Sequence, residues 1–476
     1  MVSGGASLVS LLWAQAKILE PLSTPAPSAL GPHHRAPAPR QWILLMCLFL
    51  LSLPAVTPRI YSSDEIQYFA YLRSIWFDHD LSFENEYQYF YDRGIARSEG
   101  FHETFLEQKT DTNRRINFGT IGCAILWSPF YLAGDLVARA TGAPVDGFSK
   151  PYVAAVAYGS AIYGFLALLL AERCAERLGF DGVVPALAIW LGTPLLFYMY
   201  IAPPFSHACS AFGVALFTYV WLRIRDQWPT RGLVALGAAG ALMAMIREQD
   251  VFFVVGPALD FLGSRSSGRL TGGLAAVAAF AAAFAPQAAA YLILNGHLGP
   301  HSSVGHKMNW MAPHVLQVLF SPEHGFFVWT PLALVAILGL LLLPARGARY
   351  RRVGICLLLT VALQIYVGGS VDSWTVAGAF GQRRFIALTT ALVIGIAALL
   401  DRLPGTAGRR VLMVVTVLAV YWNLALIAEF SVGLMDRQRL EPGKNAYHAF
   451  VTLPRMAPSL AYRYLFDRGS FYKHGS

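Results

Sequence analysis

Apolar residues occur along this chain in long continuous runs, separated by short turns that carry charges, Pro or Gly. Each run covers about 15 to 25 residues, enough for a helix to cross a hydrocarbon core of about 30 Å. Barrel strands would instead alternate apolar and polar residues over segments of about ten. The pattern predicts an all-α, polytopic membrane protein with about 11–12 transmembrane helices. The predicted spans begin near Trp42, Phe118, Val153, Val183, Ser206, Gly232, Val251, Leu270, Phe326, Val353, Phe385 and Val411.

The composition agrees with this class. Of the 476 residues, 55% are hydrophobic and only 14% are charged, which leaves too little polar surface for a soluble protein of this length. The formal net charge is +9, but the basic residues are spread over many short loops, so nucleic-acid binding gains no support. The lipid bilayer is the expected environment and partner.

The basic clusters predict an orientation. They lie at 223–231, 265–269, 346–352 and 402–410. Alternate loops place all four on one side, and the positive-inside rule makes that side cytoplasmic. We therefore expect a disordered cytoplasmic leader over 1–41, a transmembrane domain over 42–432 with an external loop at 61–116, and an external tail over 433–476. The protein would lie in a cell membrane with its active face external or periplasmic.

One early segment conflicts with this arrangement. If 118–138 and 153–171 both crossed the membrane, the later basic loops would lie on the wrong side relative to the first loop. Pro129 and Asp135 interrupt the run over 118–138. We expect this segment to be re-entrant and packed against protein rather than a plain span.

The first external loop carries the most informative residues. Between residues 61 and 116 there are eleven acidic residues against six basic ones, a net charge of −5. Asp64 and Glu65 open a helical pattern whose apolar positions, Ile66, Phe69 and Ala70, are expected to lie in the headgroup layer. An acidic pair at the membrane face suggests chemistry there. The alternative is that Asp64 merely caps the helix.

Further polar groups are predicted to reach the same external face. They are Arg114-Arg115, Ser206-His207, Arg247-Glu248-Gln249-Asp250 and Gln382-Arg383-Arg384. External arginines run against the positive-inside tendency, so they need another reason to be there. Guanidinium groups match phosphate oxygens, and a membrane protein meets phosphate at this depth chiefly in lipid head groups. For Arg247 an ion pair with Glu248 or Asp250 is the alternative.

The external loop over 296–325 contains five histidines but no H-E-x-x-H spacing. We predict neither a metal nor another cofactor, although a divalent metal stays an alternative. Trp374 is a candidate for stacking on a sugar, and an interfacial aromatic belt is the other interpretation of such tryptophans.

An external loop that begins Ser63-Asp64-Glu65 with Tyr68 nearby, followed by many spans with arginines near their outer ends, resembles the C-type (GT-C) integral-membrane glycosyltransferases. The likeness extends to the protein O-mannosyltransferases, the aminoarabinose transferases and uncharacterised bacterial relatives. It covers roughly residues 40–400. Segments 319–331 and 378–385 look typical of those relatives.

The resemblance implies a catalytic base at Asp64, with Glu65 as its neighbour. The family's second acidic position is replaced here by Ser206-His207, so His207 takes over acid-base work, the acceptor differs, or activity is lost. The implied donor is a sugar on a polyprenyl phosphate, and the acceptor is a hydroxyl of a glycan, lipid or protein.

The donor phosphate would be held by arginines, and the substrate would contact further side chains. The expected phosphate ligands are Arg115, Arg247, Arg383 and Arg384, and the expected substrate contacts are Tyr68, Gln249 and Trp374. Base and phosphate clamp should be separate, because a salt bridge would weaken the base. A transporter or flippase for a lipid-linked or polyol substrate, or a non-catalytic envelope-assembly protein, is the alternative. A transporter would also need cavities and arginines for phosphate, whereas a scaffold needs no such convergence. The transferase requires Asp64, His207, Arg247 and Arg383 to line one outward-facing cavity of roughly a few hundred Å³.

Overall fold

The structure is a computed structural model that describes residues 40–472 except 97, 265–267, 377 and 404. The leader predicted over 1–41 lies almost entirely outside the described residues. The described residues from Trp42 onward belong to one compact unit, to which the description below applies. Within the described ranges the chain is helical and contains no β-strand. The α-helices are α2 (Arg40–Ser52), α3 (Ser63–Arg73), α4 (Glu84–Asp92), α5 (Glu99–Phe101), α6 (Gly122–Thr141), α7 (Lys150–Arg177), α8 (Val183–Gly192), α9 (Leu195–Tyr200), α10 (His207–Ile224), α11 (Thr230–Ile246), α12 (Val255–Leu262), α13 (Arg269–Asn295), α14 (Ser302–His306), α15 (Val315–Phe320), α16 (Phe326–Trp329), α17 (Pro331–Leu342), α18 (Ala348–Ser370), α19 (Thr389–Arg402), α20 (Gly405–Val432), α21 (Pro442–Tyr447) and α22 (Leu453–Phe466).

Six helical segments among the described residues are long and apolar enough to cross a membrane. They are α7, α10, α13, α18, α20 and the continuous segment Arg383–Arg402 that contains α19. Shorter apolar helices occur at Trp42–Ala55, Val183–Gly192, Thr230–Ile246 and Pro331–Arg346. The predicted class, an all-α protein with membrane-spanning helices, is confirmed in outline. The count of about 11–12 crossings stays a prediction.

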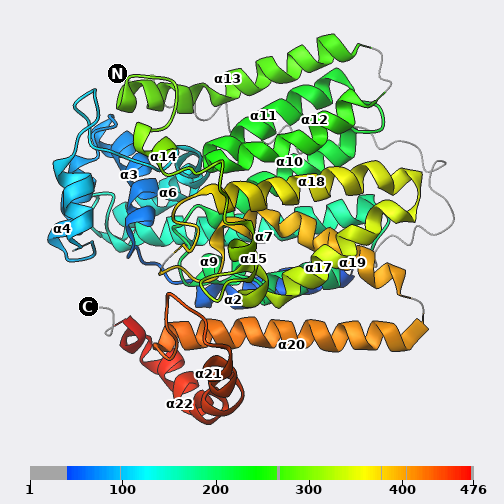
Figure 1. Ribbon diagram of the computed structural model, residues 1–476. Coiled ribbons are helices and arrows are strands. Elements are labelled where there is room, and N and C mark those ends of the chain that lie inside the picture. Colours follow the sequence, from blue (N-terminus) through cyan, green and yellow to red (C-terminus); the bar gives the residue numbers. More distant parts are fainter. Residues whose placement is uncertain (1–39, 97, 265–267, 377, 404, 473–476) are drawn as a thin grey trace. The chain divides into compact units, whose positions relative to one another are not determined.

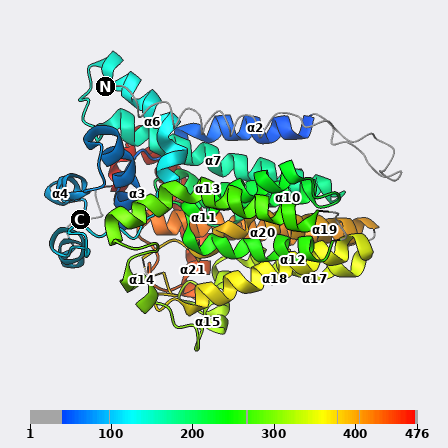
Figure 2. The same cartoon turned by 90° about the horizontal axis from the view of Figure 1, so that it is seen from above.

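The long helices run side by side, so the bundle has two ends (Figure 1). At one end Arg225 bonds Asp260 at 2.9 Å, Arg352 lies 3.8 Å from the same carboxylate, and Arg349 donates to the carbonyl of Arg177. We call this the basic end, because residues of the predicted basic clusters meet there. The acidic stretch with α3 and α4 lies at the opposite end, which we call the loop end (Figures 1 and 2).

Helix α6 begins and ends near the loop end. At its start, the Thr120 hydroxyl donates to the carbonyl of Ile246, the last residue of α11, at 2.8 Å. Gly122 permits this approach, because a Cβ there would lie 2.4 Å from the backbone of Met245. After the helix, the backbone at Asp146 accepts a bond from Arg73 of α3 at 3.4 Å. The chain therefore reaches the basic end through α7 and not through α6, which agrees with the expected re-entrant character.

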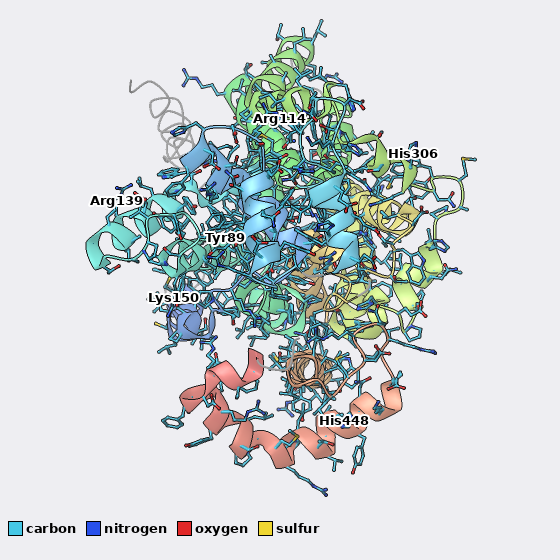
Figure 3. The ribbon with its side chains drawn as sticks, turned by 90° about the vertical axis from the view of Figure 1, so that its left-hand side faces the viewer. Tyr89, Arg114, Arg139, Lys150, His306 and His448 are labelled. Atoms are coloured by element: carbon cyan, nitrogen blue, oxygen red, sulfur yellow. The ribbon has the colours of Figure 1, made fainter. Side chains whose placement is uncertain are left out.

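The first loop is a folded unit with its own core. Ile66, Phe69 and Ala70 are all fully buried and pack with Trp127 and Tyr131 of α6. The predicted placement of this face in the headgroup layer is therefore wrong: it is covered by protein. The apolar residues do share one face of a helix, as predicted. A face that meets lipid and a face that meets protein have the same helical period, so the spacing alone cannot distinguish them. In Figure 3, which views the loop end, Tyr89 of α4 lies near the centre and Arg139 of α6 to one side.

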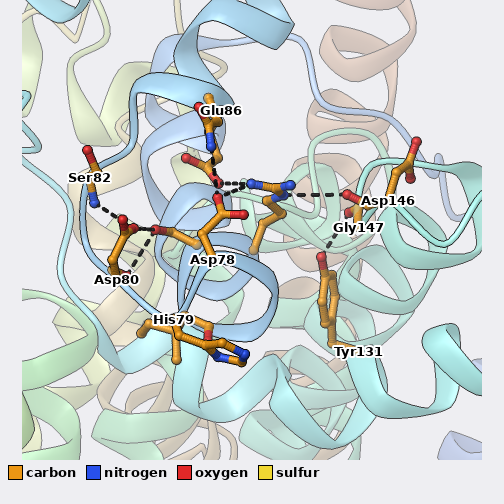
Figure 4. A network of polar contacts seen from close by, with 12 residues as sticks. Asp78, His79, Asp80, Ser82, Glu86, Tyr131, Asp146 and Gly147 are labelled. Carbon is orange, nitrogen blue, oxygen red and sulfur yellow. Dashed lines mark hydrogen bonds and ion pairs between the residues drawn. The ribbon is translucent and has the colours of Figure 1, made fainter.

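Arg73 holds this unit together (Figure 4). Its guanidinium contacts the carboxylates of Asp78 and Glu86, the latter at 3.0 Å. Next to it, the Tyr131 hydroxyl donates to the carbonyl of Gly147 at 2.8 Å. These contacts connect α3 and α4 to the segment between α6 and α7. They therefore hold α3, which carries Asp64 in its first turn, in a defined position.

Candidate active site

The start of α3 fixes the direction of Asp64. Ser62 is the N-cap residue and accepts a bond from the Glu65 amide at 3.4 Å, while the Glu65 carboxylate accepts from the amides of Tyr61 and Ser62 at 2.8 and 3.0 Å. This is a capping box, in which both residues satisfy backbone groups at the helix start. Asp64 takes no part in it, so the alternative that Asp64 caps the helix is wrong. Its side chain is 40% exposed and available for other contacts.

Asp64 is paired with an arginine from a late segment of the chain. Its carboxylate lies 2.7 Å from the guanidinium of Arg383, which also lies 5.2 Å from the ring centroid of Phe205. The turn before Arg383 depends on Gly381, which has φ +60° and would place a Cβ 2.6 Å from Pro194. The expectation that the base and the arginines stay separate is therefore not met, because Asp64 and Arg383 form an ion pair.

Arg247 and His207 form a second contact. Arg247 ends α11 in extended conformation, and its guanidinium contacts Nδ1 of His207, the first residue of α10. A guanidinium can only donate, so Nδ1 must offer a lone pair and the ring carries its proton on Nε2. The imidazole is buried and stacks on Phe205 at 5.6 Å. In this state His207 is a hydrogen-bond donor through Nε2 and has no free lone pair with which to act as a base.

Tyr68 lies between the Asp64–Arg383 pair and the Arg247–His207 contact. It lies one helical turn after Asp64 on α3, so both side chains share a face. Its hydroxyl interacts with Ser206 and lies within electrostatic reach of Arg247 and Asp64. Burial raises the pKa of Tyr68 to about 12, so the hydroxyl stays protonated and can donate.

Arg384 belongs to the same group. It lies within electrostatic range of Arg383, Arg247 and Asp64, and its guanidinium donates to the carbonyl and hydroxyl of Ser373 at 2.8 and 3.1 Å. The Gln249 side chain donates to the Arg384 carbonyl at 3.3 Å, which ties this arginine to the turn that follows Arg247. Three arginines therefore lie near the Asp64 carboxylate, which pairs with one of them, and the group as a whole carries positive charge.

A second acidic residue lies behind this group and was not predicted as part of the site. The Asp250 carboxylate is fully buried and accepts a bond from the Ser210 hydroxyl at 2.6 Å. Burial raises its pKa to about 6, opposed by the charge of Arg247. The sequence signal was present, because Asp250 stands three residues after Arg247, but nothing local predicts a partner on α10. The described residues show no ion pair of Arg247 with Glu248 or Asp250; Glu248 is bonded by Tyr291 instead.

Three predicted site residues have other neighbours. Arg115 pairs with Glu84 at 2.7 Å and donates to the Glu107 carbonyl, so its bonds lie within the first loop. Glu65 is occupied by the capping box, and burial raises its pKa to about 8. Trp374 accepts a bond from Gln382 through its carbonyl, and its ring lies 5.5 Å from that of His314. The structure brings Asp64, Tyr68, His207 and the other three arginines together, with Gln249 beside them.

The described part of the chain contains no group of three or more His, Cys, Asp or Glu residues that could hold a metal ion. The histidines of 296–325 have separate neighbours: His301 contacts Ser303, for example, and His324 donates through Nε2 to the Ala379 carbonyl.

No protein-family model matches this sequence, and no curated protein is similar enough to it to count as a relative. The fold and the site define a helical protein of membrane type with a cationic cluster around one carboxylate at the loop end.

Proposed function

We propose that this chain is a membrane glycosyltransferase that moves a sugar from a polyprenyl-phosphate donor to an acceptor hydroxyl, with inversion at the anomeric carbon. The observation that carries the proposal is the meeting of Asp64 with Arg383, Arg384 and Arg247 at the loop end. Transfer from a phosphate leaving group needs a base for the acceptor and fixed positive charge for the departing anion. Both lie here within one group of side chains.

The ion pair of Asp64 with Arg383 suggests how the site is loaded. The donor phosphate is a diester with one negative charge and two free oxygens, so it matches the charge and geometry of a carboxylate and can replace Asp64 on the Arg383 guanidinium. Its second negative charge develops as the bond to the sugar breaks, which strengthens the contact with the arginines in the transition state. The positive charges of Arg384 and Arg247 would attract the same phosphate. Donor binding would thus draw Arg383 away from Asp64 and leave the carboxylate free to act as the base.

The reaction would then proceed in one displacement. Asp64 takes the proton of the acceptor hydroxyl while that oxygen forms a bond to the anomeric carbon. The bond from this carbon to the phosphate oxygen breaks, and its electron pair leaves with the phosphate, where the arginines stabilise it. His207 and Tyr68 would donate hydrogen bonds rather than accept protons.

The proposal includes an orientation and a setting. The loop end would face the outside or the periplasm, because the basic clusters gather at the opposite end and favour the cytoplasm. The six long apolar helices and the four shorter ones would together give ten crossings. A count of about 11–12 would require one or two further segments to cross as well. The donor would arrive laterally within the bilayer.

The deciding experiment measures sugar release from a panel of labelled polyprenyl-phosphate sugars by the purified protein in liposomes. Asp64→Asn should lower turnover by about 10²- to 10⁴-fold, the usual contribution of a general base. Arg247→Ala should also lower it. Asp92→Asn and Arg93→Ala alter exposed charges of the same loop and serve as matched controls, and thermal melting reports folding.

The other outcomes are equally informative. Turnover that survives Asp64→Asn would place the base elsewhere. No turnover with any donor, together with movement of the lipid-linked substrate across the liposome membrane, would replace the transferase by a transporter. Neither turnover nor movement would favour a non-catalytic envelope protein.

A further inference from the structure

The C-terminal arm, residues 433–472, is a separate feature of the loop end. Helix α22 and the π-helical turn His448–Thr452 before it pack against the last part of α20. The Tyr421 hydroxyl donates to the Ala449 carbonyl at 2.5 Å, and the Tyr421 and Phe450 rings lie 5.2 Å apart. Helix α20 stands between the arm and the rest of the bundle (Figures 1 and 3).

The far end of the arm is bound to the first apolar helix. Arg468 donates to the carbonyls of Pro54 and Ala55 at 2.6 and 2.5 Å, directly after α2. The arm therefore connects α20 and the end of α2, which are far apart in sequence. Its position is fixed from both sides, so its outward face is a defined surface.

That outward face is apolar. Pro454, Pro458, Ala461 and Leu465 recur at helical spacing along α22, and all four are exposed. The inward side is a different set, with Leu453 and Leu460 packed toward α20. Large exposed side chains continue the apolar face before α22, at Tyr447 and Phe450, and beside it, at Tyr462; Leu465 itself is 71% exposed. Phe466, 74% exposed, ends the helix on the neighbouring side.

Polar residues occupy a third side of the same helix. Arg455, Ser459 and Arg463 follow one another at intervals of four, so they form a stripe beside the apolar face. The described arm carries six basic residues against three acidic ones, a net charge of +3. An apolar face flanked by arginines is the pattern of a helix that lies in the plane of a membrane surface.

The depth of the arm agrees with that pattern. Tyr421 stands 11 residues before the end of α20, which corresponds to roughly 16 Å along the helix. A segment beside the last 16 Å or so of a membrane-crossing helix lies at the level of the headgroups and the adjoining acyl chains. The basic residues of the arm could also attract an anionic polymer outside the membrane. Such a partner would need charged and hydrogen-bonding groups, which the outward apolar face does not offer.

We propose that the arm is an interfacial membrane anchor: the face of Pro454, Pro458, Ala461 and Leu465 is seated in the bilayer, with the Arg455 side toward anionic lipid headgroups. This inference does not depend on the proposed transferase activity. It assigns the arm a lipid partner and gives the loop end of the bundle a fixed level in the membrane.

The test places a fluorescent label on each side of α22 in the full-length protein. In a Cys47→Ala background, which removes the exposed cysteine, Leu465→Cys carries the label on the apolar face and Ser459→Cys carries it on the polar stripe. Both proteins are reconstituted in vesicles of phosphatidylcholine and phosphatidylglycerol. Quenching by brominated acyl chains is compared with quenching by iodide present on both sides of the membrane.

We expect the label at 465 to be quenched by brominated lipid and to be several-fold less accessible to iodide than the label at 459. Iodide quenching of the label at 465 as strong as at 459 would place the face in water and overturn the inference. Protection of the label at 465 from both quenchers would overturn it too, because a second protein surface would then cover the face. Equal melting temperatures of the two labelled proteins show that both are folded.

Discussion

Asp64 and Arg383 lie 2.7 Å apart, although one belongs to the first loop and the other to the entry of a late apolar segment. The Asp64 side chain is 40% exposed, whereas that of Arg383 is only 21% exposed, so solvent reaches the pair mainly from the side of the carboxylate. Arg384 lies within electrostatic range of both residues. An accessible carboxylate beside a cationic cluster is suited to be exchanged for another anion.

Substitution of Arg383 should separate binding from folding. We expect Arg383→Gln to raise the KM for the lipid-phosphate donor and to lower kcat by about 10²- to 10³-fold, since one charged donor to the departing oxygen is lost. Arg383→Lys should restore little, because an ammonium lacks the planar fork. The melting temperature should change only slightly. Steady-state kinetics and melting curves check this, and an unchanged KM would remove Arg383 from the donor site.

Glu65 can be tested as a capping residue or as a catalyst. Its carboxylate accepts from two backbone amides in the capping box, and a glutamine can do the same. Glu65→Gln should therefore keep activity close to that of the parent protein, whereas Glu65→Ala should destabilise the helix start by about 1 kcal/mol. Loss of turnover in Glu65→Gln with an unchanged melting temperature would give Glu65 a direct chemical role.

The His207 contact predicts which substitution is tolerated. An asparagine oxygen lies near the position of Nδ1, so His207→Asn can still accept from Arg247, whereas His207→Phe leaves that guanidinium without its partner. We expect the KM for the donor to be nearly unchanged in the first variant and clearly raised in the second, by the 1–3 kcal/mol typical of a lost buried bond, or about 5- to 150-fold. Equal losses in both variants would instead support proton transfer by the imidazole.

Glu86 predicts a pH dependence of the first loop. Burial raises its pKa from 4.5 to about 7, despite the bond from Arg73 and with a further raising effect of Asp78. Between these values the folded protein holds a proton that the unfolded chain has released. The stabilising contribution is thus fully present below the unfolded pKa and is lost as the pH rises through about 7, by at most about 3 kcal/mol.

Hydrogen exchange of the α3 and α4 amides measures this effect. Protection should decrease between about pH 5 and about pH 8, and Glu86→Gln, which cannot ionise, should flatten the curve. The same slope in Glu86→Gln as in the parent protein would assign the pH dependence to another group.

The sequence predicted the features that depend on local composition. The long apolar runs predicted the apolar helices, and the clustered arginines predicted the basic end. Both predictions rest on the high cost of placing charged groups in lipid. Asp64 and the Arg383-Arg384 pair were found as charges at unusual positions. The sequence placed both at the same ends of neighbouring helices, but it did not predict that they pair with each other.

The parts that sequence could not predict are those that depend on distant partners. Arg115 and Arg383 both stand in an Arg-Arg pair at the end of a predicted loop. Their partners differ, because Arg115 pairs with Glu84 and Arg383 pairs with Asp64, and only the fold determines this. The burial of Phe69 likewise depends on α6, which follows it by more than fifty residues. Asp250 was visible beside Arg247, but its bond to Ser210 joins two helices whose register no local pattern contains.

The return of α6 to the loop end means that the chain leaves α2 and enters α7 at the same end of the bundle. The part between them is nevertheless bound to later helices, since the Ile121 amide donates to Gln287 of α13 at 2.9 Å and Gly122 lies against Met245 of α11. Any change of sequence around Asp64 is therefore free to alter the chemistry of the loop end only if it keeps the seat of α6 on α11 and α13.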